Sequence, residues 1–563
     1  MLLCEPPTDS TPHWIVVLRD GNRLAWTGFT SGPIVLDDDE IAAAAHDLLD
    51  LDPAAVPAAA AAALRPHVAG AGPRPPSVLL HSATQTTRGF EGDLNDVLRG
   101  NQPYDVAGYL EARVVSLAAP GDVAVGRLAP WREATEHFGV PGFDVGDCDR
   151  YYLSHALLLA AQRHDRAPVA ALTQLVGWMA EHPSAVVRLY ALDVETQIFL
   201  LWLAVRAGLD AIAVDANVPV VAQRWNRKNG LHPTVAAARQ LPAASDTPGW
   251  LAAEQRASEC AQLLGMHIPV LPGYRVVRGP DPDTFVTGVL TAADLLTERH
   301  GITRGCLKPC EAGDGARIVA GLELADRARL ARHARDAHPH GDDYLLEAHL
   351  EFPTFTAAGH PFIVAPSGHI RGGRVADGLT VQLMLGCAWE GNVLVDRAAA
   401  PDIGIPVEAY DLMTAGMHSV LGAFDGPQAD AQGCAGGLVL GGVDFGFGRI
   451  GGYYGDADQV GVIDLNLSSH GAEYMRAFHD EVRSDLPDAY VATRIFRPTE
   501  HATLAATDKV VRDAAPAGQR ARTVACVALR WGMVATTGPA PITAVETALG
   551  LVQALAGRGL AAR

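Results

Sequence analysis

The sequence lacks the features expected of a nucleic-acid-binding or membrane-spanning protein. Its 44 lysine and arginine residues are outnumbered by 64 aspartate and glutamate residues, which gives a formal net charge of −20. It contains no basic run with interleaved aromatic residues, so a nucleic-acid partner is not expected. The longest apolar run, Ile198 to Val205, is far shorter than the ~20 residues that cross a bilayer, so no membrane partner is expected either.

Cysteine motifs are absent as well. The 8 cysteines are scattered and form no Cys-x-x-Cys or Cys/His cluster with zinc spacing. Cys306 and Cys310 flank Lys308, and we interpret them as a strand residue and a loop residue. The N-terminus, MLLCEPPTDSTP, lacks a basic segment followed by a long apolar one, so no signal peptide is evident. These features favour a cytoplasmic, reducing location.

The chain does contain enough apolar sequence for several cores. Its 563 residues correspond to about three or four domains, and a content of 48% hydrophobic and 19% charged residues is typical of a globular protein. Lysine is scarce, with Lys228, Lys308 and Lys509 as its three occurrences. Because arginine does not replace lysine where a compact point charge is needed, these positions are candidates for such a role.

The first two hundred residues are expected to form strands first and then alternating strands and helices. Strands are predicted in 13–36, one or two helices in 41–69, and two β-rich runs around a Pro-Gly-Asp turn in 112–130. From about residue 111 the alternation predicts a parallel sheet covered by helices. Asp215 and Asn217 then fall at the carboxyl end of a strand, where such sheets bind ligands, although turn formation is an alternative role for both.

A strand–loop–strand–helix–strand unit is predicted between residues 304 and 351. Its first strand carries Lys308, and the loop after it contains Gly313, Asp314 and Gly315. Glycines beside a lysine suit a phosphate cradle, because backbone N–H groups can close on the anion; an ordinary hairpin turn is the alternative. An extended segment at 355–399, a helix near 406–422 and a tail of two strands and a helix ending at Gly557 complete the prediction.

The stretch LVLGGVDFGFGRIGGYYGDADQVGVIDLNLSSHGA, residues 438–472, reads as two short strands joined by a glycine-rich loop. Residues two apart in a strand point to the same face, so Asp464 and Asn466 project together. If the strands pair antiparallel, Asp444 lies across from them. Three hard oxygen ligands on one face are what magnesium carrying a nucleotide requires, whereas the alternative is that these residues serve turns.

The chain resembles the ATP-grasp ligases in the order of its motifs. These are Lys228, Lys308, the glycine loop at 313–315, the segment EAHLE at 347–351 and the pattern D…DLN that ends at Asn466. The resemblance implies that Lys228 and Lys308 bind nucleotide phosphates, with Lys308 also contributing to catalysis, and that Gly313, Asp314 and Gly315 form the phosphate loop. It further implies that the segment Glu347, Ala348, His349 and Leu350 meets adenine and that Glu351 binds the ribose. The same resemblance makes Asp444, Asp464 and Asn466 ligands of Mg2+.

The sequence departs from this pattern at two positions. Asp464 stands where a glutamate is usual, and Ser468 stands where an arginine commonly stabilises the reacting intermediate. We consider Arg371, Arg374 and His470 as replacements and select Arg374 as the candidate catalytic residue.

The resemblance implies an α/β and α+β multidomain protein with the ATP-grasp fold. We predict an N-terminal extension of unknown role at 1–110 and, before the ATP-grasp region, an α/β domain at 111–230. The ATP-grasp region itself is predicted to comprise a lid at 231–350 and a metal and substrate subdomain at 351–484. A C-terminal appendix at 485–563 follows. The appendix resembles that of the pheganomycin-type peptide ligases.

The implied activity is ADP-forming, ATP- and Mg2+-dependent joining of a carboxylate to an amine through an acyl phosphate, in biosynthesis of a specialised metabolite. The expected partners are small-molecule carboxylate and amine substrates, with a homodimer left open. The alternatives are an ATP-grasp kinase or carboxylase acting on another acceptor, and a non-catalytic nucleotide-binding protein.

Overall fold

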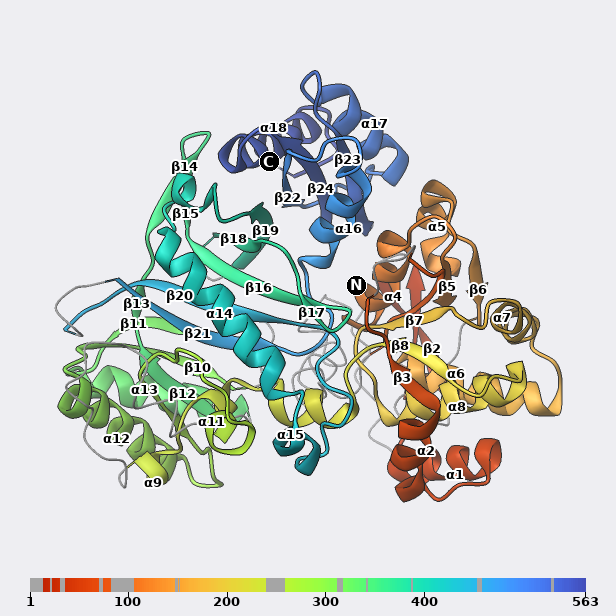
Figure 1. The fold of residues 1–563 in the computed structure, drawn as a ribbon, viewed down its shortest axis with the longest axis horizontal. Helices are drawn as coiled ribbons and strands as arrows, with labels where there is room; N and C mark the ends of the chain where they lie inside the picture. The colour runs from red at the N-terminus through yellow and green to blue at the C-terminus, as the bar shows by residue number, and fades with distance from the viewer. Residues whose placement is uncertain are drawn as a thin grey trace.

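The chain forms a mixed α/β structure built around one parallel and two antiparallel sheets (Figure 1). The computed structural model describes residues 14–20, 23–30, 36–69, 74–82, 106–146, 150, 152–238, 259–310, 317–340, 343–385, 388–452, 458–527 and 531–562. In this part of the chain no helix combines the length and the apolar character needed to cross a membrane.

The parallel sheet has six strands in the order β3-β8-β7-β4-β5-β6. The strands are β3 (Leu64–Pro66), β4 (Ser77–Leu80), β5 (Val123–Gly126), β6 (Gly142–Asp144), β7 (Val186–Leu189) and β8 (Ile212–Asp215). The helices that pack in this unit are α1 (Asp38–Leu49), α2 (Val56–Ala63), α4 (Val106–Leu117), α5 (Arg132–Phe138), α6 (Leu153–Arg166), α7 (Ala170–Glu181) and α8 (Val194–Ala207). The predicted alternation of strands and helices is therefore confirmed for this sheet.

Helix α8 shows why the sheet is so well buried. Its sequence, VETQIFLLWLAVRA, is apolar on nearly every face, and its neighbours include α1, α2, α6 and α7. The side chain of Asp193 accepts a hydrogen bond from the backbone N–H of Thr196 at 2.7 Å and so caps the first turn. Gly208 ends the helix with a φ of 67°, a left-handed conformation that suits glycine.

The first β-rich run predicted in 112–130 is wrong. Residues 112–117 belong to helix α4, whereas the second run does form strand β5. Leu110, Val114 and Leu117 recur at helical spacing and are all buried. Their packing against the sheet outweighs the strand preference of the Val114–Val115 pair.

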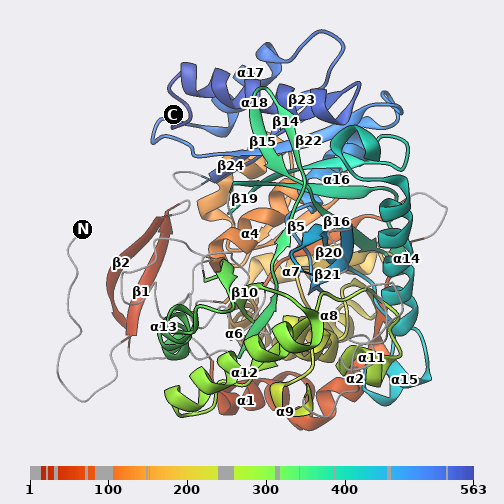
Figure 2. The same ribbon diagram turned by 90° about the vertical axis from the view of Figure 1, so that its left-hand side faces the viewer.

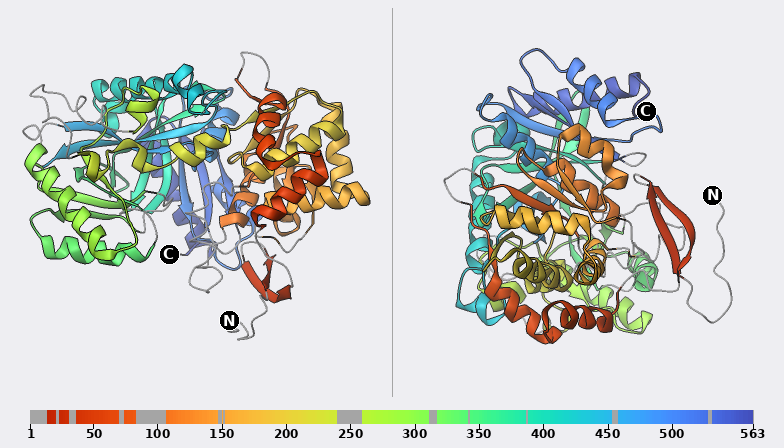
Figure 3. Two further views of the ribbon diagram at one scale, coloured as in Figure 1. Left: turned by 90° about the horizontal axis from the view of Figure 1, so that it is seen from below. Right: turned by 90° about the vertical axis from the view of Figure 1, so that its right-hand side faces the viewer.

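Strands β3 and β4 lie in the segment predicted as the N-terminal extension, so the parallel sheet includes residues from both sides of residue 110. The five domain boundaries themselves stay predictions. The predicted strands at the start of the chain are confirmed as β1 (Trp14–Asp20) and β2 (Arg23–Thr30), which pair as a hairpin. Figures 2 and 3 show this hairpin standing apart from the three sheets.

The smaller antiparallel sheet has the order β11-β10-β12-β9. Its strands are β9 (Gly273–Val276), β10 (Arg304–Pro309), β11 (Val319–Glu323) and β12 (Tyr344–Ala348). Helices α12 (Pro282–His300) and α13 (Arg327–Ala337) pack against each other and against this sheet. Three of its strands and α13 confirm the unit predicted for residues 304–351.

The larger antiparallel sheet has ten strands, with the path β13-β20-β16-β18-β19-β22-β24-β23 and with β17 and β21 attached to β16 and β20. Its strands are β13 (Leu350–Glu351), β16 (Ala365–Arg371), β17 (Arg374–Val375), β18 (Leu379–Leu385), β19 (Ala388–Val395), β20 (Gly441–Ile450), β21 (Asp458–Asn466), β22 (Tyr490–Phe496), β23 (Ala521–Val527) and β24 (Trp531–Gly538). The hairpin of β14 (Thr354–Ala357) and β15 (His360–Ile363) stands beside it. The accompanying helices are α14 (Val407–Ala423), α15 (Pro427–Ala431), α16 (Glu473–Val482), α17 (Leu504–Ala514) and α18 (Pro541–Gly557).

The tail is part of this large sheet. Strands β23 and β24 and helix α18, which ends at Gly557, confirm the predicted order of two strands and a helix. Strand β22 links the tail strands to β19. In Figure 1, α17 and α18 lie at the top of the molecule beside these strands, and α14 crosses the large sheet.

The chain passes directly from the small sheet to the large sheet at His349. Strand β12 pairs with β9 and β10 in the small sheet, whereas β13, which begins one residue later, pairs with β20 in the large sheet. The predicted single strand over residues 343–351 is thus two strands. Its end is the connection that sets the two antiparallel sheets side by side.

Candidate functional site

The site is built on the antiparallel pair β20 and β21. Asp444 lies directly across from Asp464, and Gly442 lies across from Asn466. The amide Nδ2 of Asn466 donates a hydrogen bond to Oδ2 of Asp444 at 2.9 Å. The two strands therefore pair antiparallel as expected and bring the three predicted oxygen ligands together on one face of the large sheet.

Two neighbouring strands surround Asp444 with hydrogen-bond donors. Gln382 on β18 donates from Nε2 to Oδ1 of Asp444 at 2.9 Å, and Ser367 on β16 also hydrogen-bonds this carboxylate. Burial raises the pKa of Asp444 to about 6, the charge of Asp464 adds to this effect, and the hydrogen bonds reduce it. Burial and the neighbouring carboxylate therefore disfavour the ionised form of Asp444 in this acid pair of Asp444 and Asp464, and Lys228 offsets this only in part.

Two lysines from different parts of the fold meet consecutive residues of β21. The ammonium Nζ of Lys228 lies 2.8 Å from Oδ2 of Asp464. The ammonium Nζ of Lys308, on β10, donates to the backbone carbonyl of Ile463 at 2.9 Å. Lys509, the third lysine, lies on the exposed surface of α17 and pairs with Asp513. Two of the three lysines therefore lie beside the acid pair.

Lys308 and Glu347 form a buried ion pair that His232 extends. Nζ of Lys308 lies 2.5 Å from Oε1 of Glu347, and Nε2 of His232 lies 3.1 Å from Oε2. Burial alone would lower the pKa of Lys308, but the carboxylate of Glu347 outweighs it and the pKa is raised. Burial would raise the pKa of Glu347, and Lys308 and His232 reverse this, so its pKa is lowered.

This arrangement needs a glycine at position 273. A Cβ on Gly273 would lie 2.8 Å from Cβ of Glu347 and 2.9 Å from Nδ1 of His232. Both distances are shorter than ordinary van der Waals contacts. Strand β9 can therefore approach the His232–Glu347 pair because residue 273 has no side chain.

The segment after Glu347 forms the connection between the two sheets. Ala348 and Leu350 are buried, and Ala348 donates its backbone N–H to the carbonyl of Pro272 at 2.8 Å. Glu351 lies at the surface and pairs with Arg304, Oε1 to Nη1 at 3.0 Å. The predicted adenine and ribose residues thus lie at the junction of the sheets, and their role in binding stays a prediction.

The structure describes only some of the other residues predicted for the site. Gly313, Asp314 and Gly315 are outside the described residues. Arg374 is exposed on β17, and its role as a catalytic residue stays a prediction. Arg371 pairs with Glu473 at 3.3 Å and with Asp480 at 3.0 Å, and His470 stacks on His369 with Nε2 2.7 Å from its Nδ1. Ser468, which stands at the expected arginine position, is buried.

The side chain of Asn217 links the parallel sheet to β20 and β21, the two strands that carry Asp444 and Asp464. Its side-chain amide donates to the backbone carbonyls of Leu440 and Leu467 at 2.7 and 2.8 Å, and its oxygen accepts from the N–H groups of Val439 and Leu440 at 2.7 and 3.1 Å. These backbone groups lie just before β20 and just after β21. Asn217 follows the carboxyl end of β8, as predicted from the sequence, and from there it holds both β20 and β21.

Three further polar residues were missed by sequence reasoning. His232 supports Glu347, Gln382 supports Asp444, and Asn226 accepts the backbone N–H of Leu467 at 2.5 Å. Each lies more than sixty residues from its partner, so neither spacing nor periodicity could reveal it. The one available signal was the proximity of Asn226 to Lys228 in the segment QRWNRKNG.

Asp444, Asp464 and Asn466 offer oxygen donors of the kind that a divalent cation prefers. Among the described residues, no group of three or more His, Cys, Asp or Glu side chains is placed to hold a metal ion. The acid pair supplies two carboxylates and Asn466 supplies an amide, which is a hard oxygen donor set short of a complete shell. Such a set fits an ion that takes its other ligands from phosphate and water.

Comparison with known proteins gives distant structural similarity. No family model matches the chain, and no curated protein matches its sequence. One similar solved structure is an ADP complex of N5-carboxyaminoimidazole ribonucleotide synthetase, with a TM-score of 0.42 and 11% identity over 86% of this chain and 97% of that chain. Another is carboxyaminoimidazole ribonucleotide synthase from Aspergillus clavatus complexed with ATP, with a TM-score of 0.41 and 10% identity over 86% and 99%.

A third similar structure is D-cycloserine synthetase, with a TM-score of 0.27 and 17% identity over 53% of this chain and 84% of that chain. At such identities and TM-scores, these similarities assign no activity to the chain. The function has to be inferred from the residues of the site.

Proposed function

We propose that the chain is an ATP-grasp ligase that joins a carboxylate to an amine with release of ADP and phosphate. One observation carries the proposal: Lys228 and Lys308, from separate segments, converge on Asp464 and Ile463 beside the Asp444–Asp464 pair. Scarce lysines next to paired carboxylates suit a site that binds the phosphates of a nucleotide and its magnesium ion.

The nucleotide would lie where the two antiparallel sheets meet. Lys308 and Lys228 would turn their ammonium groups from Glu347 and Asp464 to the phosphates, and the 313–315 loop would cover them. Glu347 to Leu350 would contact adenine, with Glu351 at the ribose. The direct passage from β12 to β13 supports this placement, because backbone groups there face both sheets.

Asp444, Asp464 and Asn466 would hold Mg2+. When bound, the ion would neutralise phosphate charge and orient the terminal phosphate for attack. The carboxylate pair would be held ionised by that charge, while Gln382 and Ser367 keep Asp444 in position. The lysines would stabilise the charge that develops on the phosphates, since preorganised cations in a buried site lower such a barrier.

The proposed reaction has two steps. A substrate carboxylate attacks the γ-phosphorus of ATP and forms an acyl phosphate, and ADP leaves. An amine then attacks the acyl carbon, the C–O bond to phosphate breaks, and inorganic phosphate and a proton are released with the amide. We place this activity in the cytoplasm and in the biosynthesis of a specialised metabolite, with an amino acid or peptide as a substrate.

The test is to measure ADP and phosphate release with ATP, Mg2+ and a library of acids and amines. The proposal expects ADP release that requires both an acid and an amine, and Lys308→Met should abolish it. Lys509→Met is the matched control, because Lys509 is an exposed lysine far from the acid pair, and it should keep wild-type turnover. Formation of AMP and pyrophosphate would contradict the proposal.

Ser468 favours one second candidate, a non-catalytic nucleotide-binding protein. The position lacks the arginine expected there, and Ser468 is buried. This candidate predicts that calorimetry detects MgATP binding while no acid and amine pair produces ADP. Turnover with any pair would exclude it.

A further inference from the structure

A second polar cluster lies where the parallel sheet meets the segment after β21. Strands β4 and β7 are neighbours, yet the chain leaves β4 through α4 toward β5 and leaves β7 through α8 toward β8, on the opposite side. This reversal is a topological switch point, and the carboxyl ends of the strands at such a point bind ligands in open α/β sheets. Ser469 docks there, donating its backbone N–H to the carbonyl of Tyr190 at 2.9 Å.

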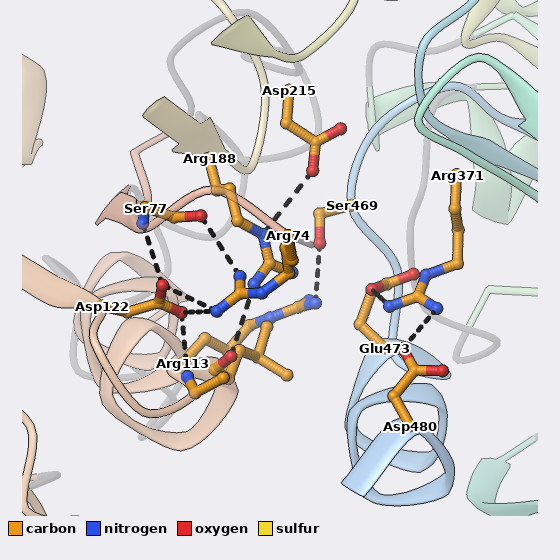
Figure 4. A network of polar contacts seen from close by, with 12 residues as sticks. Arg74, Ser77, Arg113, Asp122, Arg188, Asp215, Arg371, Ser469, Glu473 and Asp480 are labelled. Atoms are coloured by element: carbon orange, nitrogen blue, oxygen red, sulfur yellow. Dashed lines mark hydrogen bonds and ion pairs between the residues drawn. The ribbon is translucent and has the colours of Figure 1, made fainter. Parts of the chain in front are cut away.

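Two arginines line this switch point (Figure 4). Arg113, on α4, donates from Nη2 to Oγ of Ser469 and to the carbonyl of His470, both at 2.8 Å. Arg188, on β7, has its Nε 3.6 Å from Oδ2 of Asp215. Arg113 is 2% exposed, so its charge acts in a medium with little water to screen it.

Two histidines in the reach of these arginines present a ring nitrogen with no hydrogen-bond partner among the described residues. These atoms are Nδ1 of His81, which follows β4 and is 3% exposed, and Nδ1 of His470. Burial holds the pKa of His81 well below its usual value, and Arg113 and Arg188 lower it further. Burial likewise lowers the pKa of His470 to about 4. Both imidazoles are therefore neutral at neutral pH, and each can donate an N–H from Nδ1 to a ligand.

The acids of the cluster already have cationic partners. Burial would raise the pKa of Glu473, but Arg371 chiefly, together with His470, Arg188 and Arg113, lowers it to about 2. Asp215 lies beside Arg188, and burial raises its pKa. Oδ2 of Asp215 and Oε2 of Glu473 pair with Arg188 and Arg371, whereas Oδ1 of Asp215 and Oε1 of Glu473 have no hydrogen-bond partner among the described residues. The cluster thus offers cationic and N–H donor groups beside two acids that each have an arginine partner.

We propose that His81, Arg113, Arg188 and His470 form the binding site for the carboxylate group of the acid substrate. The site lies next to the acid pair, because a Cβ on Gly442, the cross-strand partner of Asn466, would lie 3.5 Å from Cδ2 of His470. That the carboxylate belongs to a substrate rests on the proposed function, whereas the binding of a carboxylate at these residues does not. A buried arginine with imidazole donors suits a carboxylate, which accepts several hydrogen bonds at once.

The binding test uses the full-length chain with 13C-labelled histidine rings, sodium acetate as the probe and acetamide as its uncharged analogue. Signals of His81 and His470 are assigned by their loss in His81→Gln and His470→Gln. We expect acetate to shift both signals saturably and acetamide to leave them in place. Absence of any acetate-dependent shift at either histidine would overturn the proposal.

The variant arm separates this site from nonspecific binding. Arg188→Gln should weaken acetate binding at least tenfold, and Arg188→Lys should restore part of the affinity because it keeps the charge. The control is Arg206→Gln, since Arg206 also pairs with an aspartate, at 2.7 Å, but on the exposed face of α8. If Arg188→Gln does not fold, His81→Leu carries the same expectation. A Kd for acetate within twofold of the wild-type value, measured in the folded variant, overturns the proposal.

The KM values for the acid and for ATP distinguish the proposed carboxylate site from the proposed ligase activity. The same variants should raise KM for the acid at least tenfold while KM for ATP stays within twofold. Acetate-dependent histidine shifts without ADP release for any acid would leave this site standing and refute the proposed ligase. Acid-dependent ADP release with an unchanged KM for the acid in these variants would support the proposed ligase and refute the carboxylate site.

Discussion

Replacing Asp444 by asparagine should stabilise the protein and abolish its proposed activity. Asp444 faces Asp464 across the β20–β21 ladder, and burial raises its pKa from 3.8 to about 6. A carboxyl group with a pKa raised on folding favours the folded state when protonated. Its contribution is therefore greatest below about pH 4 and is lost as the pH rises through about 6.

The expected gain in unfolding free energy follows from the raised pKa of Asp444. About two pKa units at ~1.4 kcal/mol each set an upper limit of about 3 kcal/mol at neutral pH. The amide of asparagine can keep only one of its two polar atoms as an acceptor, so one donor from Gln382 or Asn466 loses its partner at a cost of about 1 kcal/mol. We expect a net gain of about 2 kcal/mol.

The assay is chemical and thermal unfolding of wild type and Asp444→Asn between pH 4.5 and 8, without nucleotide or magnesium. The variant should be more stable above pH 7, and the difference should shrink toward pH 4.5, where wild-type Asp444 is mostly protonated. Asp464→Asn is the matched control, because it removes the partner of Lys228 and should destabilise the protein. A variant Asp444→Asn that is less stable than wild type at pH 7.5 would refute the reasoning.

Three further predictions concern the groups around the acid pair. Lys308→Met should cost about 3–5 kcal/mol of unfolding free energy as well as turnover, because Glu347 is left buried without its cation; the double variant with Glu347→Gln should recover stability but not ADP release. Asn217→Ala should cost about 2–4 kcal/mol in urea unfolding, since four backbone groups lose their partner, and a cost below 1 kcal/mol would contradict the clamp. Gly273→Ala should weaken MgATP binding measured by calorimetry, whereas Gly550→Ala, where a Cβ meets nothing within 4 Å, should not.

Much of the fold could be predicted from local patterns. Alternating strands and helices indicated the parallel sheet, and turn residues between short apolar runs indicated the β20–β21 pair, which carries Asp444 and Asp464. The scarcity of lysine directed attention to Lys228 and Lys308, and the structure brings both beside β21. These signals are local because they follow from residue type and spacing alone.

The parts that failed or were missed depend on tertiary packing. Residues 112–117 contain adjacent β-branched side chains, yet burial of Val114 and its helical neighbours makes them part of α4. Arg113 reaches Ser469 across 356 residues, and His232 reaches Glu347 across 115. Contacts of this kind leave no periodic trace in one sequence, so the sequence could not show that α4 and the segment after β21 share a cluster.

The most direct measurement of ligase activity is trapping of an acyl phosphate with hydroxylamine. Wild-type protein is incubated with MgATP, hydroxylamine and a library of carboxylic acids, and hydroxamate and ADP are quantified together. We expect one class of acid to give hydroxamate and ADP in equal amounts, and Asp464→Asn to give neither. ADP release with no hydroxamate for any acid, or hydroxamate accompanied by AMP, would contradict an acyl phosphate formed at the acid pair.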